Sequence, residues 1–331
     1  MTSPLIDKFN RQITYVRLSV TDRCDFRCVY CMSEKMTFMP RAQLLTLEEL
    51  ALIGRAFVEL GVGKIRITGG EPLVRNNVLQ LFESLGQLSG LKELVLTTNG
   101  SQLPRLAKPL RDAGVKRINI SLDSLRPERF QRITRVGRLE QVLKGITAAK
   151  AAGFENIKLN AVILKHRNED EIIDLVNFAI DQELDITFIE EMPLGAIGDH
   201  DRAEVYYSSD MIYRDLSNVF TLLPTVENTG GPSKYFRIPH VKTRIGFISP
   251  HSHNFCESCN RVRVTTEGRL LLCLGQEHSV DLKRVIRAHP SEIEPLKQAI
   301  IDAMAIKPKG HDFDLNRIQP VILRHMNVTG G

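Results

Sequence analysis

Apolar residues along the first 190 positions follow two alternating patterns. Short β-branched runs typical of buried strands alternate with longer segments in which apolar residues return every three or four positions, as in amphipathic helices. The predicted strands are 15–20, 64–68, 94–98, 117–122, 157–164 and 186–190. The predicted helices are 47–60, 76–88, 103–113, 128–134, 139–152 and 169–181. A capping box, Thr46 to Glu49, marks the start of the first helix.

Strands and helices that alternate with short turns predict a parallel sheet with right-handed crossovers. Six such units predict an α/β fold, an incomplete (βα)6 TIM-like barrel that stays open, since the closed form has eight. Glycine, proline and polar residues then crowd 195–201 and 228–233. We therefore expect a barrel core over residues 1–225 and a C-terminal α+β extension over 226–331.

Polar residues gather where the predicted strands end, at 68–71, 97–99, 121–123 and 190–192, with 158–160 farther down its strand. Any one group could be a helix cap or a turn. Five together favour a ligand site, because ligands of such barrels lie at the carboxyl ends of the strands. In 69–72, Gly-Gly-Glu-Pro, the glycines allow close approach and the carboxylate could hold an ammonium group.

Cys24, Cys28 and Cys31 follow the first predicted strand in a loop without helical period, with Tyr30 before the last cysteine. An iron-sulfur cube normally takes one thiolate on each of its four irons, so three ligands leave one iron open for another molecule. The alternatives are zinc, which usually wants paired knuckles of a different spacing, or reduced structural thiols. The pattern favours a catalytic 4Fe-4S cluster.

A second set, Cys256, Cys259 and Cys273, lies in the extension. Residues 261–266 and 269–274 predict a hairpin around a two-residue turn at 267–268, which places Cys273 opposite Val262 and beside Cys259. The three sulfurs can then converge on one metal. Structural zinc is the strongest alternative, with His253 completing a Cys3His site.

Composition narrows the function classes. The 331 residues are 43% apolar and 25% charged, and 44 basic against 39 acidic residues give a net charge of +5. The scattered basic residues and the absence of an aromatic-rich RNA motif argue against nucleic-acid binding. With no signal peptide and no long apolar run, we expect a cytoplasmic protein with no membrane partner, whose thiols stay reduced.

The segment Cys24 to Cys31 resembles the signature of the radical S-adenosylmethionine enzymes. The resemblance implies that S-adenosylmethionine chelates the open iron and, after accepting one electron, releases a 5'-deoxyadenosyl radical that removes hydrogen from the substrate. It also implies S-adenosylmethionine contacts at Tyr30, Gly70, Ser121 and Met192.

The second cysteine set resembles one subfamily, which cyclises GTP in the first step of molybdenum cofactor biosynthesis. There a second 4Fe-4S cluster also has an open iron, which the guanine base occupies. The resemblance implies GTP contacts at these positions: Arg17, Arg66, Thr97, Lys158, Arg261, Val262 and Arg263. It also implies that the C-terminal Gly330 and Gly331 act inside the active site, and that Arg17 is one candidate for donating the last proton.

The reaction that this implies removes hydrogen from C3' of the ribose, joins C3' to C8 of guanine, and gives 3',8-cyclo-7,8-dihydro-GTP. Implied partners are an electron donor of flavodoxin or ferredoxin type and a downstream enzyme that forms the cyclic pyranopterin; a homodimer is possible. No P-loop motif is present, so arginine and lysine side chains must hold the phosphates.

Other possibilities stay open at this point. One is a radical S-adenosylmethionine enzyme that acts on a different substrate, such as a peptide, with the second cluster as an electron relay. Another is a zinc-dependent binding or regulatory protein with two structural metal sites. The expected hairpin also poses a difficulty, because Val262 would share a face with Cys273 while Arg261 and Arg263 point away.

Overall fold

The computed structural model describes residues 4–197, 200–290, 292–315, 317 and 322–330. Its central feature is one curved sheet with the strand order β12-β11-β10-β1-β2-β3-β4-β5-β6-β9-β8-β7. The core strands, all parallel, are β1 (Tyr15–Ser19), β2 (Lys64–Thr68), β3 (Glu93–Thr98), β4 (Val115–Ser121), β5 (Ile157–Val162) and β6 (Asp185–Ile189). All six predicted strands are present, and the open barrel is confirmed.

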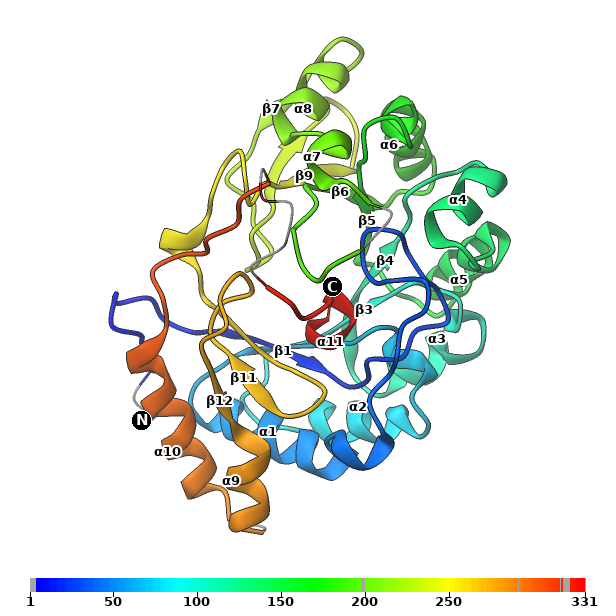
Figure 1. The fold of residues 1–331 in the computed structure, drawn as a ribbon. Coiled ribbons are helices and arrows are strands. Elements are labelled where there is room, and N and C mark those ends of the chain that lie inside the picture. The colour runs from blue at the N-terminus through cyan, green and yellow to red at the C-terminus, as the bar shows by residue number, and fades with distance from the viewer. Residues whose placement is uncertain (1–3, 198–199, 291, 316, 318–321, 331) are drawn as a thin grey trace.

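Helices cover the outer face of this sheet (Figure 1). They are α1 (Leu47–Glu59), α2 (Val78–Gly86), α3 (Leu103–Asp112), α4 (Pro127–Thr134), α5 (Leu139–Ala151) and α6 (Ile172–Asp181), which agree with the predicted helices to within a few residues. The capping box is formed, since Thr46 Oγ1 accepts from Glu49 N and Glu49 Oε2 accepts from Thr46 N. No helix of the described residues is both long enough and apolar enough to cross a membrane.

The C-terminal extension continues the barrel sheet at both edges. β9 (Arg244–Ile248) pairs in parallel with β6, and β10 (Arg261–Val264) pairs in parallel with β1. The remaining elements are α7 (Arg202–Val205), α8 (Ser209–Ser217), β7 (Leu223–Pro224), β8 (Lys234–Arg237), β11 (Arg269–Leu271), β12 (Ser279–Asp281), α9 (Leu282–Ala288), α10 (Glu294–Ala303) and α11 (Met326–Thr329). The barrel wall thus contains residues that are far apart in sequence.

The expected register of the second hairpin is wrong by one residue. β10 and β11 pair Arg263 with Leu271 and Val264 with Leu270, because a three-residue loop closed by Thr265 and Arg269 replaces the two-residue turn. Gly268 sits in this loop at φ +87°, a conformation that glycine adopts without strain. Continued toward the cysteines, this register sets Cys273 opposite Arg261 instead of Val262. In this register Arg261 and Arg263 lie on the same face as Cys273, so the arginines do not point away from the cysteine as expected.

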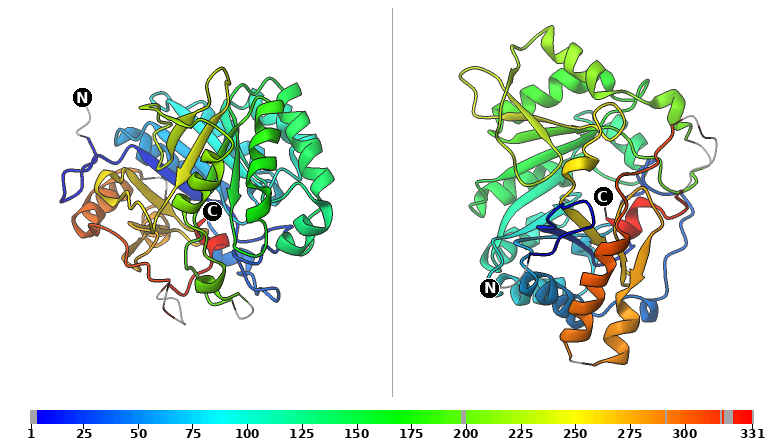
Figure 2. Two further views of the ribbon diagram at one scale, coloured as in Figure 1. Left: turned by 90° about the horizontal axis from the view of Figure 1, so that it is seen from above. Right: turned by 90° about the vertical axis from the view of Figure 1, so that its left-hand side faces the viewer.

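The last described residues lie inside the barrel. Figure 1 and both views of Figure 2 place α11 and the last described residues within the curve of the sheet, close to the strands rather than at the periphery. Asn327 and Thr329 are fully buried, and Asn327 Nδ2 donates to the Asp22 carbonyl at 2.8 Å. The C-terminal segment is therefore part of the interior surface.

Candidate active site

Each cysteine set lines a cavity of its own. Cavity A contains Cys24, Cys28 and Cys31, and cavity B contains Cys256, Cys259 and Cys273. The two cavities share four lining residues, which are Asn160, Ile189, Met192 and Met326. A ligand in one cavity can therefore contact a ligand in the other across this shared wall.

Two glycines let the cysteine loop pack against the end of β2. A Cβ on Gly70 would lie 2.5 Å from the Arg23 carbonyl oxygen, so no larger residue fits there. Gly70 N donates to Thr21 O at 2.7 Å, and Glu71 N donates to Arg23 O at 2.8 Å. The sequence predicted that something would pack closely against these glycines. In the structure, the backbone of residues 21–23 does so.

Glu71 does not offer its carboxylate to cavity A. It is fully buried, and it accepts hydrogen bonds from Leu73 N, Thr98 Oγ1 and Asn99 N. Burial raises the pKa of Glu71 to about 8 against these lowering hydrogen bonds. The carboxylate fixes the strand end of β3, and the idea that it holds a ligand's ammonium group is not supported by this geometry.

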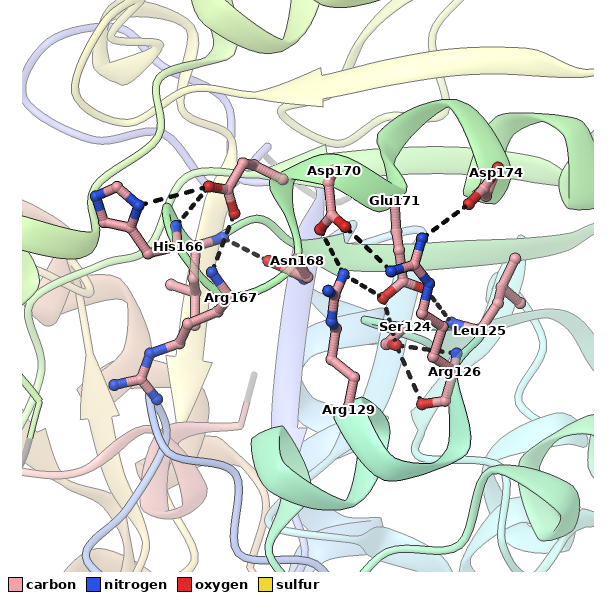
Figure 3. A network of polar contacts seen from close by, with 12 residues as sticks. Ser124, Leu125, Arg126, Arg129, His166, Arg167, Asn168, Asp170, Glu171 and Asp174 are labelled. Atoms are coloured by element: carbon pink, nitrogen blue, oxygen red, sulfur yellow. Dashed lines mark hydrogen bonds and ion pairs between the residues drawn. The ribbon is translucent and has the colours of Figure 1, made fainter.

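Asp123, which lines cavity A, adjoins a polar network around Glu171 (Figure 3). The Glu171 carboxylate accepts from Ser124 Oγ at 2.7 Å and from Arg129 Nη1 at 2.8 Å, joining the segment after β4 to the start of α6. Asn168 Nδ2 donates to the Asp123 carbonyl at 2.8 Å. The Asp123 carboxylate in turn accepts from the Tyr30 hydroxyl at 2.7 Å. The network therefore orients the aromatic residue of the cysteine motif.

The first cysteine set fits an iron-sulfur cluster. Burial raises the pKa of Cys24, Cys28 and Cys31, so binding of a cationic metal core must drive their ionisation. The three thiols line the same cavity, and a cube takes each thiolate on a different iron.

The second set is surrounded by positive charge. Burial raises the pKa of Cys259, but the nearby Arg261 and Lys307 outweigh burial and lower it. Burial raises the pKa of Cys273. His253, the candidate fourth zinc ligand, is exposed, and its Nε2 lies 2.7 Å from Asp210 Oδ1. The histidine is thus engaged away from the cysteines.

Strand register concentrates cations on the inner face of three neighbouring strands. Because alternate residues share a face, the pairings of β2, β1 and β10 set side chains in two rows. One row is Lys64, Tyr15 and Arg261, and the other is Arg66, Arg17 and Arg263. All six line cavity B, and Lys158 joins them from β5. Cavity B is therefore built for an anion.

The C-terminal tail meets this cationic face. Arg263 Nη1 donates to the Gly330 carbonyl at 2.5 Å, and Arg17 Nη2 lies 3.5 Å from the same oxygen. Gly330 has φ +77°, and a Cβ there would lie 2.1 Å from Thr68 Cγ2. Gly331 lies outside the described residues. The last described residue is thus fitted between β2 and the arginines.

The structure brings most of the predicted site residues together. Tyr30, Gly70, Ser121 and Met192 line cavity A. The following predicted GTP residues line cavity B: Arg17, Arg66, Lys158, Arg261, Val262 and Arg263. Thr97 instead lines cavity A, although its hydroxyl accepts from Arg66 Nη1 at 2.9 Å. The side chain of Val262 is almost fully buried and packs in the core.

Three charged or ionisable residues that line these cavities, Lys64, Tyr15 and Asp123, were not assigned a role from the sequence. Lys64 and Tyr15 line cavity B, but in the sequence they look like ordinary strand residues. Asp123 was noted only as part of a polar group, and its bond to Tyr30 depends on the fold. The alternation of Lys64 with Arg66, and of Tyr15 with Arg17, was the available signal.

Comparison with known proteins agrees with this geometry. A family model described as Radical SAM superfamily matches residues 18–179, and one described as Molybdenum Cofactor Synthesis C matches 184–313. The GTP 3',8-cyclase of Saccharophagus degradans is 62% identical over 329 residues, covering 99% of both chains. That of Pseudomonas entomophila is 61% identical, covering 99% of this chain and 98% of the relative.

Among solved structures, Streptococcus suis SuiB bound to S-adenosylmethionine superposes with a TM-score of 0.65 at 14% identity, covering 97% of this chain and 79% of that chain. At this identity the match shows a shared fold. The fold and the cysteine cavities define a radical S-adenosylmethionine enzyme, whose cofactors are 4Fe-4S clusters and S-adenosylmethionine. Within that class, the chain belongs to the GTP 3',8-cyclase family.

Tyr15 gives a testable consequence of the cationic rows. Burial raises its pKa, but the charges of Arg66, Arg17 and Lys64 outweigh burial and lower the pKa to about 7. We expect phenolate absorbance of the cluster-free protein to rise near pH 7, and this step to vanish in Tyr15→Phe. Tyr207→Phe is the control, because burial raises the pKa of Tyr207 and its removal leaves the step intact.

The lowered pKa of Tyr15 also makes the free energy of unfolding depend on pH. An unfolded tyrosine ionises near pH 10, so ionisation of Tyr15 stabilises the fold fully above pH 10, and this contribution is lost as pH falls through about 7. The destabilisation caused by Tyr15→Phe, measured by denaturant unfolding, should therefore grow between pH 7 and 10. If the two proteins differed in unfolding free energy by the same amount at pH 7 and pH 10, the lowered pKa of Tyr15 would be contradicted.

Proposed function

We propose that this chain converts GTP to 3',8-cyclo-7,8-dihydro-GTP, the first step of molybdenum cofactor biosynthesis. The observation that carries the proposal is the pair of cationic rows beside the second cysteine set, in a cavity that shares a wall with the first. The hydrogen at C3' of the ribose is removed, and C3' becomes bonded to C8 of guanine.

The cationic rows suit the triphosphate of GTP. Burial, together with the charges of neighbouring arginines, lowers the pKa of Arg17 to about 10 and that of Arg263 more strongly. Like charges that are buried side by side repel one another, and a bound anion relieves this repulsion. Arginine forks and lysines bind phosphate oxygens by charge-assisted hydrogen bonds, and a triphosphate supplies several negative charges at once.

Each cysteine set has a proposed ligand. Cys24, Cys28 and Cys31 hold one 4Fe-4S cluster, and Cys256, Cys259 and Cys273 hold another near the guanine base. When bound, the first cluster and S-adenosylmethionine supply the radical that removes hydrogen. Tyr30, Gly70, Ser121 and Met192 would position S-adenosylmethionine in cavity A. Arg17, Arg66, Thr97, Lys158, Arg261, Val262 and Arg263 would position GTP.

The parallel strands β1 and β10 place the two cysteine sets at opposite ends of the barrel. Cys24 follows the C-terminal end of β1, whereas Cys259 precedes the N-terminal end of β10, which runs parallel to β1. At about 3.3 Å per residue, the five residues of β1 span roughly 16 Å. This length accommodates a nucleotide between the two ends, with its ribose near the shared wall at Met192 and Met326.

Several finer assignments belong to the same proposal. We infer a flavodoxin or ferredoxin type of electron donor, a downstream enzyme that forms the cyclic pyranopterin, and a cytoplasmic location; a homodimer is possible. The division into a core over 1–225 and an extension over 226–331 is likewise proposed. Arg17, Gly330 and Gly331 are the proposed catalytic residues at the tail.

The direct test is anaerobic incubation of the reconstituted enzyme with S-adenosylmethionine, a reductant and GTP. We expect 5'-deoxyadenosine and a cyclised nucleotide with the mass of GTP, detected by mass spectrometry. ATP is the matched control, since it offers the same triphosphate with a different base. Formation of 5'-deoxyadenosine no faster with GTP than without nucleotide would refute the proposal.

Arg261 tests the role of the cationic rows. It is half-buried, stacks on Phe255 and lies next to Cys259, and the loss of a charge-assisted hydrogen bond costs about 1.5–3 kcal/mol. We expect Arg261→Met to weaken GTP binding at least about tenfold, measured by calorimetry, without lowering the melting temperature of the free protein.

The control is Arg269→Met on the partner strand β11, where the guanidinium donates to Ser279 Oγ at 2.7 Å and does not line cavity B. It should leave GTP affinity unchanged. Equal affinities for the parent and Arg261→Met proteins would count against phosphate binding by this row.

A substitution at Gly330 tests whether the C-terminal tail is needed for cyclisation. Gly330→Ala places a methyl group against Thr68, so the tail must move away from Arg263. We expect cyclisation to fall at least about tenfold while iron and sulfide contents stay at the parent level, as also after deletion of Gly330 and Gly331. Gly153→Ala is the control, because Gly153 has a similar φ of +81° with open space around it. Undiminished cyclisation in Gly330→Ala would exclude a role for the seated tail.

A further inference from the structure

Lys307 is a buried ammonium group behind the second cysteine set. Its side chain is almost fully enclosed, at 1% exposure, and Nζ donates to the Leu272 carbonyl at 2.6 Å. Leu272 directly precedes Cys273. Burial lowers the pKa of Lys307, and the thiols of Cys259 and Cys273 and the Asp7 carboxylate act in the opposite direction without reversing it. The ammonium group therefore sits among the proposed cluster ligands.

No carboxylate forms an ion pair with Lys307 among the side chains that the structure describes. The neighbouring Arg11 shows the contrast, because its Nε lies 2.6 Å from Asp7 Oδ2 and its other nitrogens donate to the carbonyls of Cys256, Pro308 and Lys309. Burying a charge without a partner is strongly unfavourable. The positive charge of Lys307 thus points to an anion at the cysteines.

Two cations bond to the backbone of the second cysteine set. Lys307 Nζ donates to the Leu272 carbonyl, next to Cys273, and Arg11 Nη1 donates to the Cys256 carbonyl at 2.8 Å. Arg11 already pairs with Asp7, whereas Lys307 has no such ion pair among the described side chains. Because reduction adds negative charge to a cluster, a buried cation beside its ligands favours the reduced form.

We propose that Lys307 is the charge partner of the second iron-sulfur cluster and raises the reduction potential of that cluster. This inference rests on the proposed function, in that Cys256, Cys259 and Cys273 must hold a cluster. Lys307 acts on the cluster from beside Cys273, since its hydrogen bond is to the Leu272 carbonyl and not to substrate.

The test uses full-length protein carrying Cys24→Ala, Cys28→Ala and Cys31→Ala, so that only the second cluster contributes to the spectrum. Its midpoint potential is measured by redox titration with electron paramagnetic resonance detection. Lys307→Met in this background should lower the equilibrium constant for reduction about tenfold, which is 59 mV for one electron. Lys307→Arg keeps the charge and should restore most of the shift.

Lys309→Met is the matched control, because it removes the same charge two residues away from an exposed side chain, and it should leave the potential unchanged. Loss of the cluster from Lys307→Met but not from Lys307→Arg would equally support a charge partner. An intact cluster with an unshifted potential in Lys307→Met, or loss of the cluster from both variants, would overturn the inference. A parent background without iron and sulfide would refute the second cluster itself.

Discussion

The parallel pairing of β10 with β1 is the constraint on which the site depends. Nearly 250 positions separate these strands, yet their register sets Arg261 beside Tyr15 and Arg263 beside Arg17. A shift of one residue would exchange the faces of alternate residues and turn both arginines into the core. The same pairing fixes Cys259 at the opposite end of the barrel from Cys24. Strand register thus determines both the anion-binding face and the spacing of the two proposed clusters.

Local patterns predicted the barrel well, because each strand and helix has a periodicity of its own. The strand 64–68 is found as predicted, and the helix after Thr46 starts at its capping box. The hairpin register failed, since a three-residue loop with Gly268 at positive φ differs from a two-residue turn by one position only. The roles of Lys64 and Tyr15 depend on a strand from the far end of the chain, which no local pattern describes. Glu71 likewise acquires its partners only when β3 lies beside β2.

Cavity B binds its proposed ligand with groups that are unfavourable in its absence. Arg17, Arg66 and Lys64 converge on Tyr15, whose ionisation would offset part of their mutual repulsion. Lys64 pairs with Glu93 at 2.7 Å and Arg66 donates to Tyr15 and Thr97, and a bound triphosphate would add further negative charge. A triphosphate that binds the folded state alone would therefore stabilise it by mass action. Affinity for the substrate and the repulsion among the cations of the empty site would then have one physical origin.

The C-terminal tail couples the two cavities. A helix of four residues such as α11 does not hold its shape by its own hydrogen bonds, so its order comes from contacts at both ends. Asn327 bonds to Asp22, just before the first cysteine set, and Gly330 bonds to Arg263 in cavity B, while Met326 lines both cavities. Displacing the tail would free an arginine and open the shared wall at once. The tail thus belongs to the wall between the proposed radical source and its substrate, and both sites are complete only when it is seated.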